Sequence, residues 1–588
     1  MQSEKKMVNI KINNIPLKVE AGTTIIEAAK LIHIDIPHLC YHPDQTVKAH
    51  CRMCVVEVVG SRKLLAACST VVWEGIEVHT DTKRVRDTQV GILELILANH
   101  GQNCLSCARN QNCELQDLCS RFNILRPTLP SVNVKQPMQI KNPSIVRDLS
   151  KCVKCGRCVK VCKEVQGISA LTYSNRSSNF MVTTAYNKPL EDTDCTFCGQ
   201  CSVVCPVGAI VELDDTQRVW EAMHDPKKHV IVQVAPAVRV ALGDSLGLKP
   251  GTIATGKLVT ALKMLGFDKV FDTNFAADLT IMEEGSELLD RIKNGGPLPM
   301  ITSCSPGWIN FMEKNFGDLL EHLSTAKSPQ QMFGAVSKSY YAKKTGIDPH
   351  DIVTVSIMPC TAKKYEATRP EMEHDGIPDV DIVITTRELI KMIKYVGLKF
   401  VDLPSTEFDS PLGLGTGAGA IFGTSGGVME AALRTVYEVY TGKELKKLDF
   451  IDVRGYEGIK EASIKLGDKE IKVAIAHGLL NARKLMEGVK AGETPYTFIE
   501  IMACPGGCIG GGGQPVTTIV DIKKLRMDAL YDIDNSSAIR KSHENPDIVT
   551  LYNEYLGSPL SELSHELLHT HYTCLLYTSD AADDSLRV

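Results

Sequence analysis

Long apolar runs and an excess of basic residues are both missing from this 588-residue sequence, whose net charge is −5. The apolar stretch "VGILELILAN" is interrupted by Glu94 and is shorter than the roughly 20 residues that cross a bilayer, which argues against membrane insertion. The first residues contain neither an apolar leader nor a twin arginine, so we expect a cytoplasmic protein. Because there is no basic arm or face, nucleic acid is not an expected partner.

Cysteine, in contrast, is abundant, with 21 residues. In a reducing compartment, clustered thiols bind metal rather than pair as disulfides. A chain of this length is expected to form several domains and to bury a core that needs no disulfides. Most of the cysteines lie in short spacings that suit metal ligands, so the sequence predicts a metal-binding protein of several modules.

The first predicted module, residues 7–84, combines a hairpin, a helix and four cysteines. Residues 7–20 alternate apolar and polar side chains around a turn at 13–14, and residues 23–34 follow with helical periodicity. Four cysteines surround the next loop: Cys40, Cys51, Cys54 and Cys68. This layout predicts a β-grasp ferredoxin-like domain with a [2Fe–2S] cluster, although the first gap is longer than in the plant type. A zinc site with four cysteines is the alternative.

The second predicted module, residues 85–125, contains a mixed set of ligands: His100, Cys104, Cys107 and Cys113. Three thiolates and one imidazole can hold either zinc or a [4Fe–4S] cluster, and this motif alone does not decide between them. A neutral histidine in place of a thiolate removes negative charge and should raise the potential of a cluster. Cys119 fits neither set, so we expect a buried free thiol there.

The third predicted module, residues 143–213, repeats one motif twice. Both copies follow the spacing C-x₂-C-x₂-C-x₃-C, which is typical of bacterial ferredoxins with two [4Fe–4S] clusters, where each fourth cysteine ligates the other cluster. The predicted ligands of the first cluster are Cys152, Cys155, Cys158 and Cys205, and those of the second are Cys162, Cys195, Cys198 and Cys201. Together with the preceding sites, they predict an electron wire that must end in the rest of the chain.

Residues 228–535 are predicted to form a large mixed α/β domain. Short apolar runs that read as buried strands alternate with segments of helical periodicity, which predicts a largely parallel sheet with its chemistry at the carboxyl ends of the strands. A helical segment, residues 536–573, is expected to follow. Residues 574–588 share no pattern with it and look like a non-native tail, so Cys574 is excluded from the chemistry; a disordered natural tail is the alternative.

Four further cysteines follow predicted strands: Cys304, Cys360, Cys504 and Cys508. Thiols at equivalent strand ends can converge on one site, so we expect them to end the wire. The glycines around the last two are Gly506, Gly507 and Gly510 to Gly513, and they suggest backbone that closely approaches a bulky object. A phosphate-binding loop is the rival interpretation, but no Lys-Ser or Lys-Thr follows.

Three stretches, "TSCSPGW", "MPCTAKKYE" and "EIMACPGGCIGGGGQP", resemble the signature sequences of [FeFe]-hydrogenases. With the N-terminal row of cysteine motifs, the resemblance covers the chain to about Thr573. The layout is similar to the large clostridial-type enzymes and to the catalytic subunit of multimeric NAD(P)-linked hydrogenases. The resemblance implies an H-cluster, in which a [4Fe–4S] cube is joined through one cysteine to a two-iron unit with CO, cyanide and a dithiolate bridge.

The resemblance also implies roles for individual residues. Cys360, Cys504 and Cys508 match ligands of the cube, with Cys508 as the bridge, and Lys363 matches a donor to cyanide, where an ammonium would pair a buried anion. The residues that match the surroundings of the cofactor are Met358, Met502, Pro236 and Gln330. Those that match the family's proton path are Glu284, Glu287, Arg291 and Ser324.

One position departs from the family, which usually has two adjacent cysteines where this chain has Cys304 and Ser305. The first cysteine of that pair is the proton relay and the second is a ligand of the cube. A cube without its fourth thiolate is harder to accept than a hydroxyl in proton transfer, although a hydroxyl is a poorer acid. We therefore predict that Cys304 is the ligand and that Ser305 takes part in proton transfer.

The predicted function is that of a hydrogenase, which catalyses 2H⁺ + 2e⁻ ⇌ H₂ with four accessory clusters, one [2Fe–2S] and three [4Fe–4S]. Ferredoxin or NAD(P)-linked subunits are the expected electron partners, since the chain has no flavin or nicotinamide motif, and H-cluster maturation proteins are also expected partners. Three alternatives are an electron-transfer subunit of an NADH or formate dehydrogenase, an iron–sulfur assembly protein without H₂ activity, and an H₂ sensor. An electron-transfer subunit would not need Cys360, Cys504 and Cys508 within the signature stretches quoted above.

Overall fold

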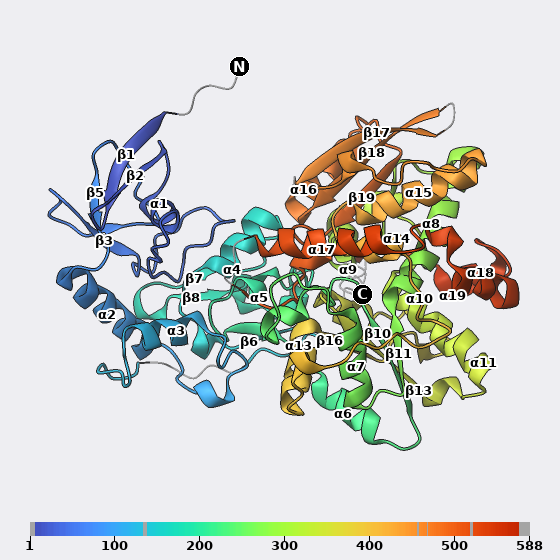
Figure 1. The fold of residues 1–588 in the computed structure, drawn as a ribbon, viewed down its shortest axis with the longest axis horizontal. Coiled ribbons are helices and arrows are strands. Elements are labelled where there is room, and N and C mark those ends of the chain that lie inside the picture. The colour runs from blue at the N-terminus through green and yellow to red at the C-terminus, as the bar shows by residue number, and fades with distance from the viewer. Residues whose placement is uncertain (1–5, 133–137, 456–457, 467–468, 518–520, 576–588) are drawn as a thin grey trace, which may run out of the picture.

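The computed structural model describes residues 6–132, 138–455, 458–466, 469–517 and 521–575. Three small cysteine-rich modules lie on one side of a large module, and the third of them lies between the first two and the large one (Figure 1). The residues 576–588 of the predicted tail lie outside the described residues. Within the described residues, no helix is both long and apolar enough to cross a membrane.

The first module is a five-stranded sheet that packs against a short helix. Asn13 and Asn14 both have positive φ, 47° and 69°, which is the backbone that a two-residue hairpin turn requires. Helix α1 (Ile25–Lys30) buries its apolar side chains against the sheet. The sheet has the order β2-β1-β5-β3-β4 and comprises β1 (Met7–Ile12), β2 (Ile15–Glu20), β3 (Val55–Val58), β4 (Leu65–Ala66) and β5 (Glu77–His79).

The next two modules are built from short elements around cysteine loops. Gly156 and Gly199 occupy equivalent positions in the two repeats, each at positive φ immediately before a short helix. A Cβ at either glycine would collide with Tyr173 or Thr361, which explains the residue type. The elements are α2 (Lys83–Ala98), α3 (Glu114–Arg121), β6 (Ile145–Arg147), α4 (Arg157–Lys160), β7 (Thr172–Ser174), β8 (Met181–Thr183), α5 (Gln200–Val203) and β9 (Ile210–Glu212).

The large module contains two four-stranded sheets, not the single sheet that the strand pattern suggested. The first is wholly parallel, in the order β11-β10-β13-β16, and comprises β10 (His229–Val234), β11 (Lys269–Asp272), β13 (Ile352–Met358) and β16 (Ile382–Thr385). The second has the order β12-β19-β18-β17 and comprises β12 (Met300–Ile301), β17 (Ile459–Leu466), β18 (Lys469–His477) and β19 (Phe498–Met502), of which only β17 is antiparallel.

Helices cover both faces of each sheet. The first sheet lies between α7 and α13 on one face and α8 and α10 on the other, and the second lies between α8 and α15 on one face and α9 and α16 on the other. Helix α8 therefore serves both sheets. The helices are α6 (Thr216–His224), α7 (Thr255–Leu265), α8 (Thr273–Asn294), α9 (Pro306–Asn315), α10 (Pro329–Val336), α11 (Ala342–Thr345), α12 (Ala362–Glu366), α13 (Thr386–Tyr395), α14 (Gly417–Ile421), α15 (Gly427–Thr441) and α16 (Leu479–Lys490).

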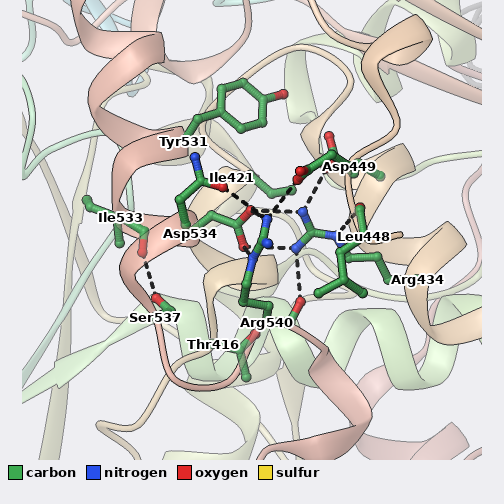
Figure 2. Close-up of polar contacts among 12 residues, drawn as sticks. Thr416, Ile421, Arg434, Leu448, Asp449, Tyr531, Ile533, Asp534, Ser537 and Arg540 are labelled. Atoms are coloured by element: carbon green, nitrogen blue, oxygen red, sulfur yellow. Dashed lines mark hydrogen bonds and ion pairs between the residues drawn. The ribbon is translucent and has the colours of Figure 1, made fainter. Parts of the chain in front are cut away.

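The C-terminal segment docks onto this module through α17 (Ile522–Ser536), α18 (Pro546–Leu551) and α19 (Glu562–Leu568). Arginine–carboxylate pairs connect α17 to α15 (Figure 2). The last helix of this segment, α19, ends at Leu568. His569 then forms an antiparallel bridge with Ala326, and backbone hydrogen bonds of 2.7–2.8 Å join residues 568 and 570 to residues 325 and 327.

Candidate active site

A cavity lies where strand ends of both sheets meet. Three loops bring thiols to it: Cys304 follows β12, Cys360 follows β13, and Cys504 and Cys508 follow β19. The ferredoxin-like module adds Cys198 to the same wall. The structure thus brings together the four strand-end cysteines and connects them to the end of the predicted wire.

The glycines of the last loop are crowded mainly by protein. A Cβ at Gly511 would lie 2.1 Å from the carbonyl oxygen of Pro359, and a Cβ at Gly512 would lie 2.3 Å from that of Cys198. These glycines let the Cys508 loop pack against the loops of Cys360 and Cys198. Gly507 and Gly511 also line the cavity, so the idea that the glycines make room for a bulky object stays a prediction.

The thiols in the cavity are buried against one another. Burial raises the pKa of Cys508 to about 12, and the neighbouring Cys360 adds to the rise. Burial also raises the pKa of Cys504 well above the usual range, with Cys360, Cys198 and Cys508 contributing. Thiolates packed this closely repel one another in a protein interior unless a cation balances them, so the donor set suits an iron–sulfur cofactor whose irons bind deprotonated sulfur.

Cys304 and Ser305 face different neighbours. Burial raises the pKa of Cys304 well above its usual range, and the nearest charges that affect it are Glu284 and Lys363. The Ser305 hydroxyl instead accepts a hydrogen bond of 3.2 Å from the backbone N–H of Ala503, the residue before Cys504. Both residues line the cavity.

Lys363 reaches the cavity from α12 already bound to a carboxylate. Its Nζ donates to both oxygens of Glu366, at 3.1 and 2.9 Å, and to the carbonyl oxygen of Cys304 at 3.1 Å. Gln330 also donates to Glu366, at 3.0 Å. Glu366 therefore orients two predicted site residues, and its position three residues after Lys363 on one helix was the signal that sequence reasoning missed. The remaining predicted pocket residues, Pro236, Met358 and Met502, line the same cavity.

The predicted proton-path residues lie together on one side of α8 and the segment that faces it. Ser324 donates 2.9 Å to Oε2 of Glu287, and Arg291 donates 2.6 Å to its Oε1. Glu284 is 1% exposed, and its carboxyl oxygens have no hydrogen-bond partner among the described residues. Burial raises the pKa of Glu284 to about 8, and the charge of Glu287 adds to this rise. A carboxyl that is protonated at neutral pH suits proton transfer to Cys304.

The structure also brings together the other predicted cysteine sets. The thiols of Cys40 and Cys51 contact each other, and so do those of Cys54 and Cys68. Each contact shifts the pKa values of the two thiols that make it. One cavity of the third module is lined by Cys152, Cys155, Cys158 and Cys205. The thiols that affect one another's pKa at the second repeat are Cys162, Cys195, Cys198 and Cys201. The crossed arrangement of the fourth cysteines is therefore present in the fold.

His100 is a buried imidazole with one unpartnered nitrogen. The side chain is 8% exposed, and its Nδ1 has no hydrogen-bond partner among the described residues. Burial lowers the pKa of the ring, which also contacts the backbone of Lys151, and a lowered pKa favours the neutral imidazole that metal ligation needs. Cys119 is half-buried beside Cys113 and Cys104, and burial raises its pKa to about 11.

Family models match successive parts of this arrangement. The model for the iron only hydrogenase large subunit, C-terminal domain, matches residues 228–512, and the one for the iron hydrogenase small subunit matches 520–574. The N-terminal matches are a 2Fe-2S iron-sulfur cluster binding domain at 5–83, an NADH-ubiquinone oxidoreductase-G iron-sulfur binding region at 89–127, and the ferredoxin-like domain of NADH-quinone oxidoreductase subunit 3 at 142–211.

Two curated relatives match almost the entire chain. NADP-reducing hydrogenase subunit HndD of Solidesulfovibrio fructosivorans is 51% identical over 96% of this chain and 99% of its own. Iron hydrogenase 1 of Clostridium pasteurianum is 42% identical over 96% of this chain and 100% of its own. The chain belongs to the iron-only hydrogenase family. A solved apo [FeFe]-hydrogenase HydA1 from Chlamydomonas reinhardtii is 48% identical, with a TM-score of 0.56, over 62% of this chain and 99% of that structure.

These matches confirm the predicted class of enzyme and its cofactors. This iron-only hydrogenase interconverts protons, electrons and H₂, and its cofactors are a [2Fe–2S] cluster, [4Fe–4S] clusters and the H-cluster. Sequence reasoning missed Glu500, which is fully buried on β19 and accepts the N–H groups of Gly426 and Met429 at 2.6 and 2.7 Å. It holds the start of α15 beside the Cys508 loop, and its only sequence signal was an acidic residue inside an apolar strand.

Proposed function

We propose that the cavity at the strand ends holds the H-cluster, with Cys360, Cys504 and Cys508 as ligands of the cube and Cys508 as the bridge to the two-iron unit. The observation that supports this most is the convergence of thiols from three strand-end loops on one cavity beside Cys198. When bound, the H-cluster supplies the redox chemistry that joins protons and electrons. Glu366 and the Cys304 carbonyl hold the ammonium of Lys363 at the cavity, where its positive charge would attract an anionic group of the cofactor.

The roles of Cys304 and Ser305 are proposed from their neighbours. The assignment of Cys304 to the cube stays a prediction. The proximity of Glu284 and Lys363 to Cys304, and of Ala503 to Ser305, favours the opposite assignment, with Cys304 moving protons and Ser305 beside the cube.

For protons, we propose a route through Glu287, Ser324, Glu284 and the position 304/305. Glu287 accepts hydrogen bonds from Ser324 and Arg291, and Ser324 lies between the two carboxyl groups. The ion pair with Arg291 holds Glu287 in place at the outer end. The buried Glu284, with its raised pKa, would hold a proton next to the cavity.

For electrons, we propose two entries that meet at the cluster of Cys152, Cys155, Cys158 and Cys205. Tyr173 lies close to both Cys40 and Cys158, between the [2Fe–2S] site and this cluster. Cys107 lies against Gly208, three residues after Cys205, and an Arg157–Glu114 ion pair of 2.6 Å joins the same two modules. The second cluster of this module, through Cys198, would pass electrons to the cavity.

We propose that the electron partner is an NAD(P)-linked subunit or ferredoxin. The relative that is 51% identical is named as an NADP-reducing hydrogenase subunit, and this name favours an NAD(P)-linked subunit as the electron partner. H-cluster maturation proteins are proposed as further partners. The proposed compartment is the cytoplasm, because many unpaired cysteines need a reducing environment.

Infrared spectroscopy and iron analysis of matured protein test the proposed sites. We expect CO and cyanide bands and about 20 irons per chain, of which about 14 belong to the accessory clusters. Cys508→Ala should remove the bands while the irons of the accessory clusters remain, and Cys119→Ala, the matched control, should change neither. Retention of the bands in Cys508→Ala would contradict the assigned bridge. Zinc in place of iron in wild-type protein would contradict the whole set.

A further inference from the structure

We propose that protons also reach Glu287 through a second branch, made of Thr325 and His569, which the C-terminal segment supplies. The proposal rests on the proton route proposed above and adds an entry to it. It deepens that route by adding an imidazole, a group that can both accept and donate a proton through its two ring nitrogens.

The branch is a continuous chain of polar contacts. Thr325 Oγ1 lies 3.2 Å from Oε2 of Glu287 and 2.8 Å from Nδ1 of His569. The other ring nitrogen of His569, Nε2, lies 3.1 Å from Oε2 of Glu283. The backbone bridge between Ala326 and His569 holds the two segments in this register. His569 is 8% exposed, so the contacts are shielded from bulk water.

The donors and acceptors of this chain indicate the direction of proton flow. Oε2 of Glu287 already accepts from Ser324 and the Thr325 N–H, so the Thr325 hydroxyl donates to a carboxylate and accepts from His569. His569 Nδ1 then carries a hydrogen. Glu283 accepts from Tyr552 at 2.5 Å and from the backbone N–H of Leu560 at 2.9 Å, so it too acts as an acceptor toward His569. A protonated imidazole fits between these two acceptors.

Arg291, the partner of Glu287 on the predicted path, is poorly suited to carry protons. A guanidinium stays protonated at any physiological pH. This one donates to Glu287 and to the backbone carbonyls of residues 297, 321, 322 and 323. It therefore positions Glu287, and the proton itself needs a titratable group.

The outer end of the branch is an exposed histidine. His565 is exposed, and its ring centre lies 4.4 Å from that of His569. Burial lowers the pKa of His565, and the charge of His569 lowers it further. The charged and titratable groups around the pair are Glu283, Glu287, Tyr552 and His571.

Each transfer conserves the protons of the chain. Thr325 gives its hydroxyl proton to Glu287 and takes the Nδ1 proton of His569, so the hydroxyl is restored. His569 becomes neutral, a half-turn of its ring exchanges the two nitrogens, and the bare nitrogen takes the next proton from the His565 side. Reversal of the same steps releases protons when H₂ is oxidised.

The test is the pH profile of H₂ evolution by matured full-length protein, with infrared bands of the H-cluster recorded on the same samples. Thr325→Val and His569→Ala should lower turnover at alkaline pH by roughly tenfold, less than the ~100-fold that a positioned acid typically contributes, because another entry remains. The alkaline limb should move to lower pH, and the solvent isotope effect should increase. Thr325→Ser should recover most of the loss, and added imidazole should rescue His569→Ala. His571→Ala, an exposed histidine nearby, is the matched control.

The outcomes separate this proposal from the one it rests on. If Thr325→Val and His569→Ala keep the wild-type rate and pH profile while Glu287→Gln loses turnover, the branch is wrong and the main route stands. If Glu287→Gln keeps full turnover, the main route is wrong and the branch with it. If His569→Ala loses its infrared bands, the comparison of Thr325→Val with Thr325→Ser decides, and equal rates in these two would reject the branch.

Discussion

At the residue scale, two neighbouring positions after β12 differ in what they contact. Cys304 has the carboxyl of Glu284 and the ammonium of Lys363 as its nearest charges. Ser305 accepts from the N–H of Ala503 and begins α9 as its N-cap residue. A thiol next to a proton-holding carboxyl suits proton transfer, and an oxygen beside Cys504 suits a place at the cube.

Substitution separates the two assignments. If Cys304 moves protons, Cys304→Ala should stop H₂ turnover, by ~100-fold or more, while the infrared bands and iron content persist. If Cys304 is a ligand, the same change should remove iron and bands together. Ser305→Cys is the complementary variant. If Ser305 lies beside the cube, Ser305→Cys should change the redox potential of the H-cluster and leave the pH profile of H₂ turnover unchanged. A shifted pH profile would instead support a role of Ser305 in proton transfer.

At the element scale, a buried ionic network attaches α17 to α15 (Figure 2). Asp534 of α17 accepts two hydrogen bonds from Arg434 of α15, at 2.9 and 2.8 Å, and two from Arg540, at 3.2 and 2.6 Å. Arg434 is fully buried and also donates to Glu430 at 2.7 Å. The carboxyl groups of Glu430, Asp449 and Asp534 converge, but arginines fill the space between them. The network is thus an attachment of the C-terminal segment.

Asp534→Asn should destabilise this attachment by about 3 kcal/mol, because it leaves a buried guanidinium without its charge partner. Urea unfolding, with hydrogen exchange of α17 as the local measure, would test it. Asp449→Asn is the matched control, since Asp449 is 40% exposed and should contribute about 1 kcal/mol or less. Equal effects of the two would contradict the argument.

The ion pairs of Asp534 also predict that the stability of the α17 attachment depends on pH. Burial raises the pKa of Asp534, but hydrogen bonds from Arg434 and Arg540 outweigh burial and hold the pKa below its usual 3.8. Because the folded state has the lower pKa, the stabilisation is fully present above pH 3.8 and is lost as the pH falls through the depressed value. In Asp534→Asn, this acid-dependent part of the stability of α17 should be missing.

At the scale of the whole molecule, the small modules extend the active site to a distant surface (Figure 1). Each junction has its own contacts, such as the Arg157–Glu114 pair and the packing of Gly512 on Cys198. The reduction potential of each cluster then decides how readily electrons pass from one module to the next. The imidazole of His100, being neutral, should keep its cluster easier to reduce than four thiolates would.

His100→Cys should therefore lower the potential of that cluster without loss of iron, because the added thiolate charge opposes reduction. Potentiometric EPR would measure the shift. Cys119→Ala removes a nearby thiol that is not assigned as a ligand, so it should leave the potential in place. An unchanged potential in His100→Cys would mean that His100 is not a ligand.

Local sequence patterns determined much of this protein. The Asn13–Asn14 turn, the strands of 229–234 and 352–358 and the two cysteine repeats all follow from short-range spacing, because periodicity and turn geometry depend on near neighbours. The family and its cofactors followed from three short motifs. The division of the apolar strands into two sheets was not predictable, since short buried strands look alike and their pairing depends on distant partners.

What the tertiary structure alone decided is which distant residues meet. It placed Gln330 beside the Lys363–Glu366 pair, it showed that the glycines near Cys508 are crowded by other loops, and it brought His569 from the C-terminal segment to Thr325. The sequence by itself determined which residues are able to bind metal or move protons, because that ability belongs to the side chain. Their partners, burial and pKa values arise only when segments hundreds of residues apart pack together, and no local pattern encodes those contacts.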